Sequence, residues 1–233
     1  MEKLRVFIGW DSREDIAYQV ARRSLLRHAS VPVEVIPIKV DEMVAQGNYS
    51  RGVDPLASTE FTYSRFLTPH LAGFQGWALF VDCDFLFFGD VARLAQYMKP
   101  AHAVACVHHD YTPKEATKMD GVVQTSYPRK NWSSFMLFNC AHPSTRQLTV
   151  ERVNRESGAY LHRMQWAKDD EIGAIPQSWN WLEGWSEKPG HGKPDAVHYT
   201  RGGPWFDAWQ DVDYAAEWHA EAAACRAEGL AGA

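Results

Sequence analysis

An apolar run that ends in two carboxylates decides the fold of this chain: Trp77-Ala78-Leu79-Phe80-Val81-Asp82-Cys83-Asp84. The apolar part is typical of a central strand that is buried on both faces of a sheet. In an extended chain Asp82 and Asp84 point to the same side, and their like charges repel unless a cation lies between them. Ligand sites of open α/β sheets lie at the carboxyl ends of the strands. The stretch therefore predicts a cation site or, because Asp-x-Asp also occurs by chance, only turn residues after a strand.

The N-terminal part of the chain predicts a strand, a helix and a second strand. Strands are expected at 4–8 and 33–38. Asp11 or Ser12 can cap the helix between them, and Asp15 completes a capping-box-like arrangement with Ser12. This order of elements favours a parallel βαβ unit.

The rest of the chain adds further elements without a repeat or a break in composition. We expect a long loop at 41–58, helices at 61–71, 143–156, 158–166 and 213–228, strands at 103–107 and 134–138, and an irregular segment at 110–132. The pattern favours one α/β domain over 1–233, with a mostly parallel central sheet flanked by helices and a C-terminal helix inside 212–233.

Composition narrows the class of protein. The 233 residues carry a formal net charge of −5 and a pI near 6.0, which gives no overall basic footprint for nucleic acid. No stretch approaches the roughly 18 apolar residues of a membrane span. The four cysteines are far apart and contain no Cys-x-x-Cys pair, so they fit the reduced thiols of a cytoplasmic protein better than a disulfide framework or a zinc site.

A second polar segment follows a short apolar one near the C-terminus. Val197-His198-Tyr199 leads into Thr200-Arg201-Gly202-Gly203-Pro204-Trp205. Adjacent glycines let backbone N–H groups approach an anion, and Arg201 can add a charge-assisted contact to phosphate. His198 fits a structural role and a ligand role equally well.

These stretches together resemble glycosyltransferase family 8. The anchors are Gly9-Trp10-Asp11, Tyr63-Ser64-Arg65, Asp82-Cys83-Asp84 and the segment from His198 to Trp205, and the resemblance runs from Val6 to about Phe206. It implies a GT-A fold, a nucleotide-sugar donor and retention of configuration at the sugar. Two departures stand out: the family's late Gly-x-x-Lys-Pro-Trp lacks its lysine here, and the tail is acidic and alanine-rich where many relatives have a basic, aromatic tail.

The resemblance also implies roles for individual residues. Asp82, Asp84 and His198 correspond to the family's metal ligands, and an imidazole beside two carboxylates favours Mn²⁺ over Mg²⁺. The acidic segment Asp169-Asp170-Glu171 matches a family segment near the transferred sugar, which makes Asp169, Asp170 and Arg65 catalytic candidates, although a solvated helix start explains the same acids. The implied nucleotide-sugar-binding residues are Ile8, Gly9, Asp11, Arg65, Asp82, Cys83, Arg201, Gly202 and Gly203.

Two further groups offer weaker candidates. Trp132, Ser133, Trp179, Asn180 and Trp181 combine aromatic faces with polar groups, as a sugar-acceptor site requires, but core and turn roles suit them slightly better. His108-His109-Asp110 is a possible second metal group, disfavoured because adjacent side chains of a strand point to opposite sides.

The sequence thus predicts a metal-dependent hexosyltransferase that moves a sugar from a nucleotide diphosphate, by resemblance uridine diphosphate (UDP), to an unidentified carbohydrate or glycoconjugate acceptor. A phosphatase of the haloacid dehalogenase type also places Asp-x-Asp after an apolar strand, but normally after the first strand. A non-catalytic nucleotide- or sugar-binding module is the other alternative.

Overall fold

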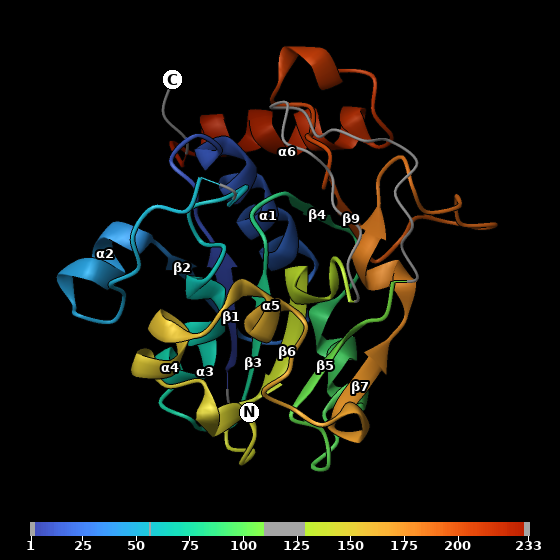
Figure 1. Cartoon of the computed structure of the whole chain (residues 1–233). Coiled ribbons are helices and arrows are strands. Elements are labelled where there is room, and N and C mark those ends of the chain that lie inside the picture. The colour runs from blue at the N-terminus through green and yellow to red at the C-terminus, as the bar shows by residue number, and fades with distance from the viewer. Residues whose placement is uncertain (1–2, 56, 110–128, 231–233) are drawn as a thin grey trace.

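The central sheet of the protein has six strands. The computed structural model describes residues 3–55, 57–109 and 129–230. The strands are β1 (Leu4–Gly9), β2 (Val33–Ile38), β3 (Trp77–Val81), β5 (Val104–Val107), β6 (Phe135–Asn139) and β7 (Ile172–Ile175), in the order β2-β1-β3-β6-β5-β7 (Figure 1). Only β6 runs against the other strands of this sheet. The predicted α/β fold with a mostly parallel sheet is therefore confirmed.

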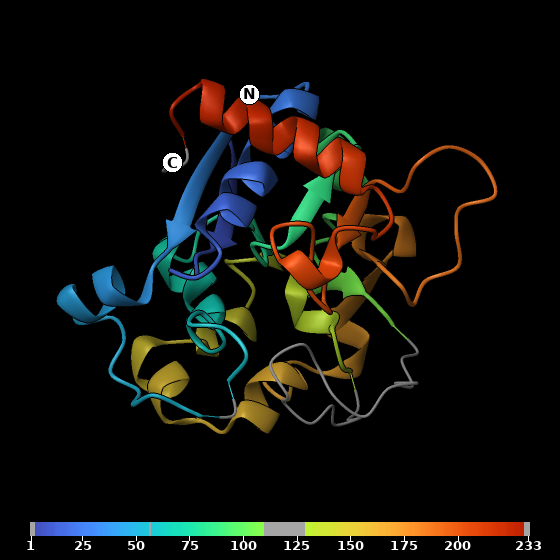
Figure 2. The same ribbon diagram turned by 90° about the horizontal axis from the view of Figure 1, so that it is seen from above.

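Both faces of this sheet are covered, which explains its continuous apolar strands. In β3 every residue after Trp77 is fully buried, and Val6 and Ile8 of β1 are equally inaccessible. Such unbroken burial is typical of a parallel strand between two layers of helices. Figure 1 and Figure 2 show α1 and α6 on one side of the sheet, with α3, α4 and α5 on the other.

A second, smaller sheet pairs the segment after β3 with two segments from the later part of the chain. Its strands are β4 (Phe85–Phe87), β9 (Ala196–His198) and β8 (Trp181–Leu182), in the order β4-β9-β8. Since β4 begins directly after Asp84 and pairs Phe85 with His198, this sheet brings His198 to the end of β3.

The helices are short apart from the first and the last. They are α1 (Asp15–His28), α2 (Val40–Ala45), α3 (Thr68–Leu71), α4 (Val150–Arg155), α5 (Gly158–His162) and α6 (Ala215–Ala227). The 3-10 helices span Ser64–Leu67, Val91–Tyr97, Trp132–Ser134, Thr145–Gln147, Asp169–Glu171, Gln177–Asn180 and Asp207–Trp209. α6 lies across α1 (Figure 2), and Trp218 and Ala222 of α6 are buried in one cluster with Val20 of α1. No described helix is long and apolar enough to cross a membrane.

The start of α1 differs from the prediction. The helix begins at Asp15 after Glu14, and no side chain caps its N-terminus. Asp11 instead accepts a hydrogen bond from the Arg13 backbone at 3.0 Å, and Ser12 contacts Glu60. The loop expected between β2 and the next helix begins with α2, because Val40 to Ala45 close helical hydrogen bonds.

Other helices are shorter than predicted. The helix expected at 143–156 is reduced to α4, which begins only after its N-cap Thr149 because a separate 3-10 helix occupies Thr145–Gln147. The helix expected at 158–166 is reduced to α5, which ends at His162, two residues before Met164 with its φ of +52°. Most of the irregular segment expected at 110–132 lies outside the described residues. The strands β4, β7, β8 and β9 were not predicted.

Candidate active site

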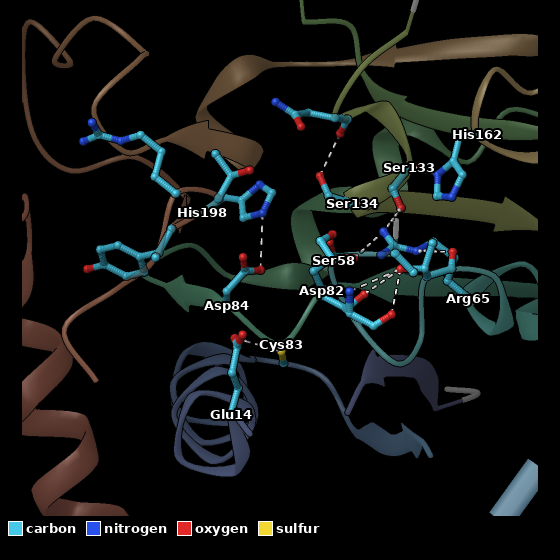
Figure 3. Close-up of a pocket in the computed structure, with 18 of the residues that line it drawn as sticks. Glu14, Ser58, Arg65, Asp82, Cys83, Asp84, Ser133, Ser134, His162 and His198 are labelled. Carbon is cyan, nitrogen blue, oxygen red and sulfur yellow. Dashed lines mark hydrogen bonds and ion pairs between the residues drawn. The ribbon is translucent and has the colours of Figure 1, made fainter. Parts of the chain in front are cut away.

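A cavity of about 420 Å³ opens where β3 ends, and residues from distant parts of the chain line it. Figure 3 shows Glu14 below this opening, Asp82 and Asp84 at its floor, and Arg65 and His162 on the side opposite His198. The carboxyl edge of the parallel strands is where open α/β sheets bind ligands.

Asp82, Asp84 and His198 form one compact group in the cavity. Each offers a ligand atom, and these atoms lie within 4.8 Å of one another. The backbone fixes the carboxylates, because the Asp82 N–H donates to Ser134 at 3.0 Å and the Asp84 carbonyl accepts from Tyr199 at 3.0 Å. Two carboxylates and an imidazole suit Mn²⁺ or another divalent cation that accepts oxygen and nitrogen ligands. The donor set therefore fits the metal that the resemblance implies.

Arg65 neutralises part of the charge in this group. Its Nη1 donates to Asp82 Oδ1 at 2.6 Å and to the Ser133 carbonyl at 3.0 Å, while Nε donates to the Thr62 carbonyl at 3.1 Å. Burial raises the pKa of Asp82 to about 6, against the lowering effect of the Arg65 charge and with a further increase from Asp84. The guanidinium is thus fixed in place as a positive charge on the cavity wall.

A chain of hydrogen bonds fixes the orientation of His198. The Ser134 hydroxyl donates to the Asn131 carbonyl at 2.7 Å, and the same oxygen accepts from Asn180 Nδ2 at 2.9 Å. Asn180 Oδ1 then lies 2.9 Å from His198 Nδ1. Since an amide oxygen can only accept, Nδ1 carries a proton, and in the neutral ring Nε2 is left with the lone pair. The Phe85 ring stacks on the imidazole, with 4.4 Å between ring centroids.

Glu14 is a carboxyl group in the cavity that the sequence analysis missed. Burial raises its pKa to about 8, and the charges of Asp84 and Asp11 add to this increase. Its Oε2 lies 3.8 Å from Sγ of Cys83, a buried residue that also lines the cavity. The sequence marks Glu14 only by its place in the polar segment after the first strand, and from that segment the prediction took Asp11 instead.

Three predicted nucleotide-binding residues are not among those that line the cavity. Ile8 and Asp11 have no exposed surface, and Asp11 accepts hydrogen bonds from Arg13 and from the Glu60 backbone. A Cβ atom on Gly9 would lie 2.4 Å from the Phe61 ring, so this glycine allows close packing of β1 against that ring. None of the three lines the cavity.

The glycine-rich turn after β9 reaches the cavity, but its polar groups are engaged in the fold. Arg201 Nη2 donates to the buried Glu183 at 2.8 Å, and its guanidinium lies over the rings of Trp185 and Trp209. The Gly202 N–H donates to the Tyr199 carbonyl at 2.8 Å. Gly203 packs against the Trp205 ring. The structure thus gives Arg201 a pairing role that the sequence did not indicate.

The acidic segment Asp169–Glu171 lies at the amino-terminal end of the parallel strands, opposite to the end where the cavity opens. β7 runs in the same direction as β3, and this segment precedes β7 whereas Asp82 follows β3. Asp169 is exposed and pairs with Arg129. The structure therefore does not bring Asp169 and Asp170 to the cavity. Residues of α5, among them His162, line it instead.

The acceptor candidates divide in the same way. Ser133 lines the cavity, whereas Trp179 and Trp181 are core residues with 1% and 3% of their surface exposed. Asn180 is buried against His198. Trp132 stacks on His108 with 4.0 Å between ring centroids, which leaves that histidine in a packing role. Asp110, the third member of the possible second metal group, lies outside the described residues.

Comparisons with solved structures agree with this architecture. The bifunctional glycosyltransferase WbbM is 17% identical with a TM-score of 0.64, and GlyE of Streptococcus pneumoniae TIGR4 is 15% identical with a TM-score of 0.62. The alignments cover 95% of this chain but only 50% and 60% of those two chains. The galactosyltransferase LgtC is 11% identical with a TM-score of 0.59 over 95% of this chain and 96% of its own. The fold is thus that of GT-A-like glycosyltransferases.

Comparisons of sequence place the chain in a family. No family model matches it, so membership of glycosyltransferase family 8 remains a prediction. Protein CDI of Arabidopsis thaliana is 55% identical over 217 residues, which cover 92% of this chain and 84% of that protein. This chain belongs to the family of Protein CDI.

Proposed function

We propose that this protein is a metal-dependent glycosyltransferase that moves a sugar from a nucleotide-diphosphate donor to a carbohydrate or glycoconjugate acceptor. The observation that carries the proposal is the compact group of Asp82, Asp84 and His198 in the cavity at the end of β3 of a glycosyltransferase-like fold. The resemblance to family 8 supports UDP as the nucleotide, Mn²⁺ as the metal, a hexose as the transferred sugar and retention at the anomeric carbon. The four buried free cysteines suit the reducing cytoplasm as the place of action.

The residues of the cavity suit a reaction whose leaving group is a diphosphate. Asp82, Asp84 and His198 Nε2 would hold the metal, which supplies Lewis-acid stabilisation of the leaving phosphate when bound. Arg65 keeps Asp82 in position and adds a fixed positive charge on the wall where negative charge would develop. In the neutral ring, the hydrogen bond from Nδ1 of His198 to Asn180 leaves the lone pair on Nε2 for that role.

The donor assignment is tested by release of UDP from a panel of UDP-hexoses in the presence of Mn²⁺. Hydrolysis to UDP without an acceptor is expected to be slow, metal-dependent and lost in Asp84→Asn. Asp207→Asn changes an exposed carboxylate outside the cavity in the same way and is expected to keep the activity. If Asp84→Asn releases UDP as fast as the unchanged protein, the proposed role of the metal group is wrong.

Two further measurements separate this function from the phosphatase and the binding module. A phosphatase would hydrolyse a generic phosphate ester with Mg²⁺ and leave UDP-hexoses intact. A binding module would bind UDP with Mn²⁺ but release none from any donor, even in large excess of protein.

A further inference from the structure

Glu14 is a carboxyl group of the cavity that the proposed metal group does not include. It lines the cavity together with Asp82, Cys83 and Asp84. Its Oε2 lies 3.8 Å from Sγ of Cys83, the residue between the two aspartates of that group. Figure 3 shows its carboxyl end pointing up from α1 toward this segment. The acid therefore lies beside the place where the metal would bind.

The local backbone explains why this side chain reaches the cavity. Glu14 is the N-cap residue of α1, and its carbonyl accepts from the N–H groups of Ala17 at 3.0 Å and Tyr18 at 3.1 Å. Its own N–H donates to the Asp11 carbonyl at 3.0 Å. N-cap side chains usually accept a hydrogen bond from the helix, but that of Glu14 forms no such bond. The backbone is thus fixed on both sides while the carboxyl group turns to the cavity.

The arginines around Glu14 pair with other acids. Arg13, its neighbour in sequence, pairs with Asp11 at 2.9 Å. Arg65, which also lines the cavity, pairs with Asp82 at 2.6 Å. Both guanidinium groups thus have a carboxylate partner other than Glu14.

Like charges therefore gather where α1 meets the end of β3. Burial raises the pKa of Glu14, and the charge of Asp84 adds to this increase, as expected for a carboxyl group among like charges. In ionised form, Glu14 and the two aspartates carry three negative charges. The one guanidinium paired among them is that of Arg65, so a divalent cation balances the difference.

Glu14 itself lies outside the group of ligand atoms, which come from Asp82, Asp84 and His198. A carboxylate beside such a group acts on the metal through its charge and by accepting hydrogen bonds from metal-bound water. We propose that Glu14 raises the affinity of the cavity for a divalent cation through its negative charge, without being a ligand of the metal. This inference rests on the proposed function, which includes the metal group.

The experiment measures Mn²⁺ affinity by electron paramagnetic resonance, with the metal alone and again in a saturating excess of UDP. Glu14→Gln keeps the size of the side chain and removes its charge, so Mn²⁺ affinity should fall about 10-fold in both conditions. Glu14→Asp keeps the charge and should lose clearly less.

Asp15→Asn is the matched control. It removes one negative charge from the next residue of the chain, which accepts from Trp10 Nε1 at 2.8 Å and is not among the residues that line the cavity. Mn²⁺ affinity should stay nearly unchanged in this variant.

Urea unfolding without metal shows whether a loss of affinity comes from the fold. Glu14→Gln is expected to keep the free energy of unfolding, because the amide has the size of the carboxyl group and no charge for Asp84 to repel. A drop in stability together with weaker Mn²⁺ binding would indicate a packing role and would overturn the inference. Equal losses of Mn²⁺ affinity in Glu14→Asp and Glu14→Gln would do the same.

The remaining outcomes are distinct. Unchanged Mn²⁺ affinity in Glu14→Gln would overturn the inference, and a loss as large as that of Asp84→Asn would make Glu14 a ligand and overturn it too. Weaker Mn²⁺ binding only in the presence of UDP would point to a contact with the nucleotide, such as its ribose hydroxyl groups, and would also contradict it. In these cases the proposed function stands. If the unchanged protein binds no Mn²⁺ with or without UDP, the proposed function fails and the inference fails with it.

Discussion

Asn180 Oδ1 lies 2.9 Å from Nδ1 of His198, and Nε2 on the other side of the ring lies 3.3 Å from Asp84 Oδ1. One buried amide thus orients the imidazole and, in the neutral ring, places its proton on Nδ1. Partners of this kind usually contribute to metal affinity even though they never touch the metal.

Replacement of Asn180 is therefore expected to weaken metal binding. Asn180→Ala removes the acceptor at Nδ1, so the proton can move to Nε2, and Mn²⁺ affinity should fall roughly 10- to 100-fold. Electron paramagnetic resonance of free Mn²⁺ measures this directly. Gln177→Ala changes an exposed amide of the same 3-10 helix and serves as the control. Unchanged Mn²⁺ affinity in Asn180→Ala would show that the ring is oriented by packing alone.

The Arg65–Asp82 pair is expected to matter for stability as well as for the site. Only 6% and 13% of the two side chains are exposed, so Arg65→Met leaves a buried carboxylate unpaired and should cost about 3–5 kcal/mol of unfolding free energy. Adding Asp82→Asn should recover a large part of that loss. Urea unfolding without metal gives both values.

The exposed pair of Arg155 and Glu151 supplies the comparison for that cycle. Both side chains are largely in solvent, so Arg155→Met should cost at most about 1 kcal/mol. A small loss in Arg65→Met, similar to that of the surface pair, would mean that water or a mobile side chain compensates for the missing guanidinium.

Gly9 should prove to be a packing residue. Gly9→Ala forces a methyl group into the fully buried Phe61 ring and should destabilise the protein by about 1–3 kcal/mol. Gly52→Ala meets no atom within 4 Å and should be nearly neutral. Nucleotide affinity of the folded Gly9→Ala protein should not change. A loss of affinity without a loss of stability would instead support the direct contact that the sequence resemblance implies.

The neutral state of His162 predicts how stability depends on pH. The ring of the unfolded chain takes up a proton near pH 6.5, whereas the folded ring does so only at about pH 3. The unfolded state therefore binds more protons between these values. The contribution to stability is complete above pH 6.5 and is lost as the pH falls, by up to about 1.4 kcal/mol per pH unit. His109, with its pKa lowered to about 3 by burial, acts in the same direction.

Urea unfolding between pH 7 and pH 5 tests this expectation. His162→Phe should reduce the slope of stability against pH by up to the contribution of one group, and the His109 contribution should remain. The same slope in both proteins would mean that the ring of His162 titrates in the folded protein as it does in the unfolded chain.

Much of the fold could be read from sequence because long apolar runs and helical spacing act locally. The runs at β1, β2 and β3 and the spacing in α1 identified these elements. The strands β4 and β8, with three and two residues, are too short to show any periodicity. They exist because Phe85 and Trp181 pair with β9, which is a long-range contact.

The site was predictable only where residue type and position in the chain coincide. Asp82 and Asp84 end an apolar strand, so their meeting place was clear, and the resemblance added His198. The prediction for Asp170 rested on similarity of sequence alone and took no account of the direction of β7. That direction places the segment at the amino-terminal end of the strands, away from the cavity. Glu14 and His162 join the cavity through tertiary packing, which no local pattern signals.

The central claim is that a nucleotide binds at Asp82, Asp84 and His198 together with a metal. The most direct test is thermal unfolding with a panel of nucleoside diphosphates, each with and without Mn²⁺. At 100 times its dissociation constant, a ligand of the folded state adds about 2.7 kcal/mol, which corresponds to roughly 5–10 °C in Tm for a chain of this size. The account predicts such a shift for UDP only with Mn²⁺, absent in Asp84→Asn and retained in Asp207→Asn. No shift with any nucleotide, or an equal shift in Asp84→Asn, would contradict it.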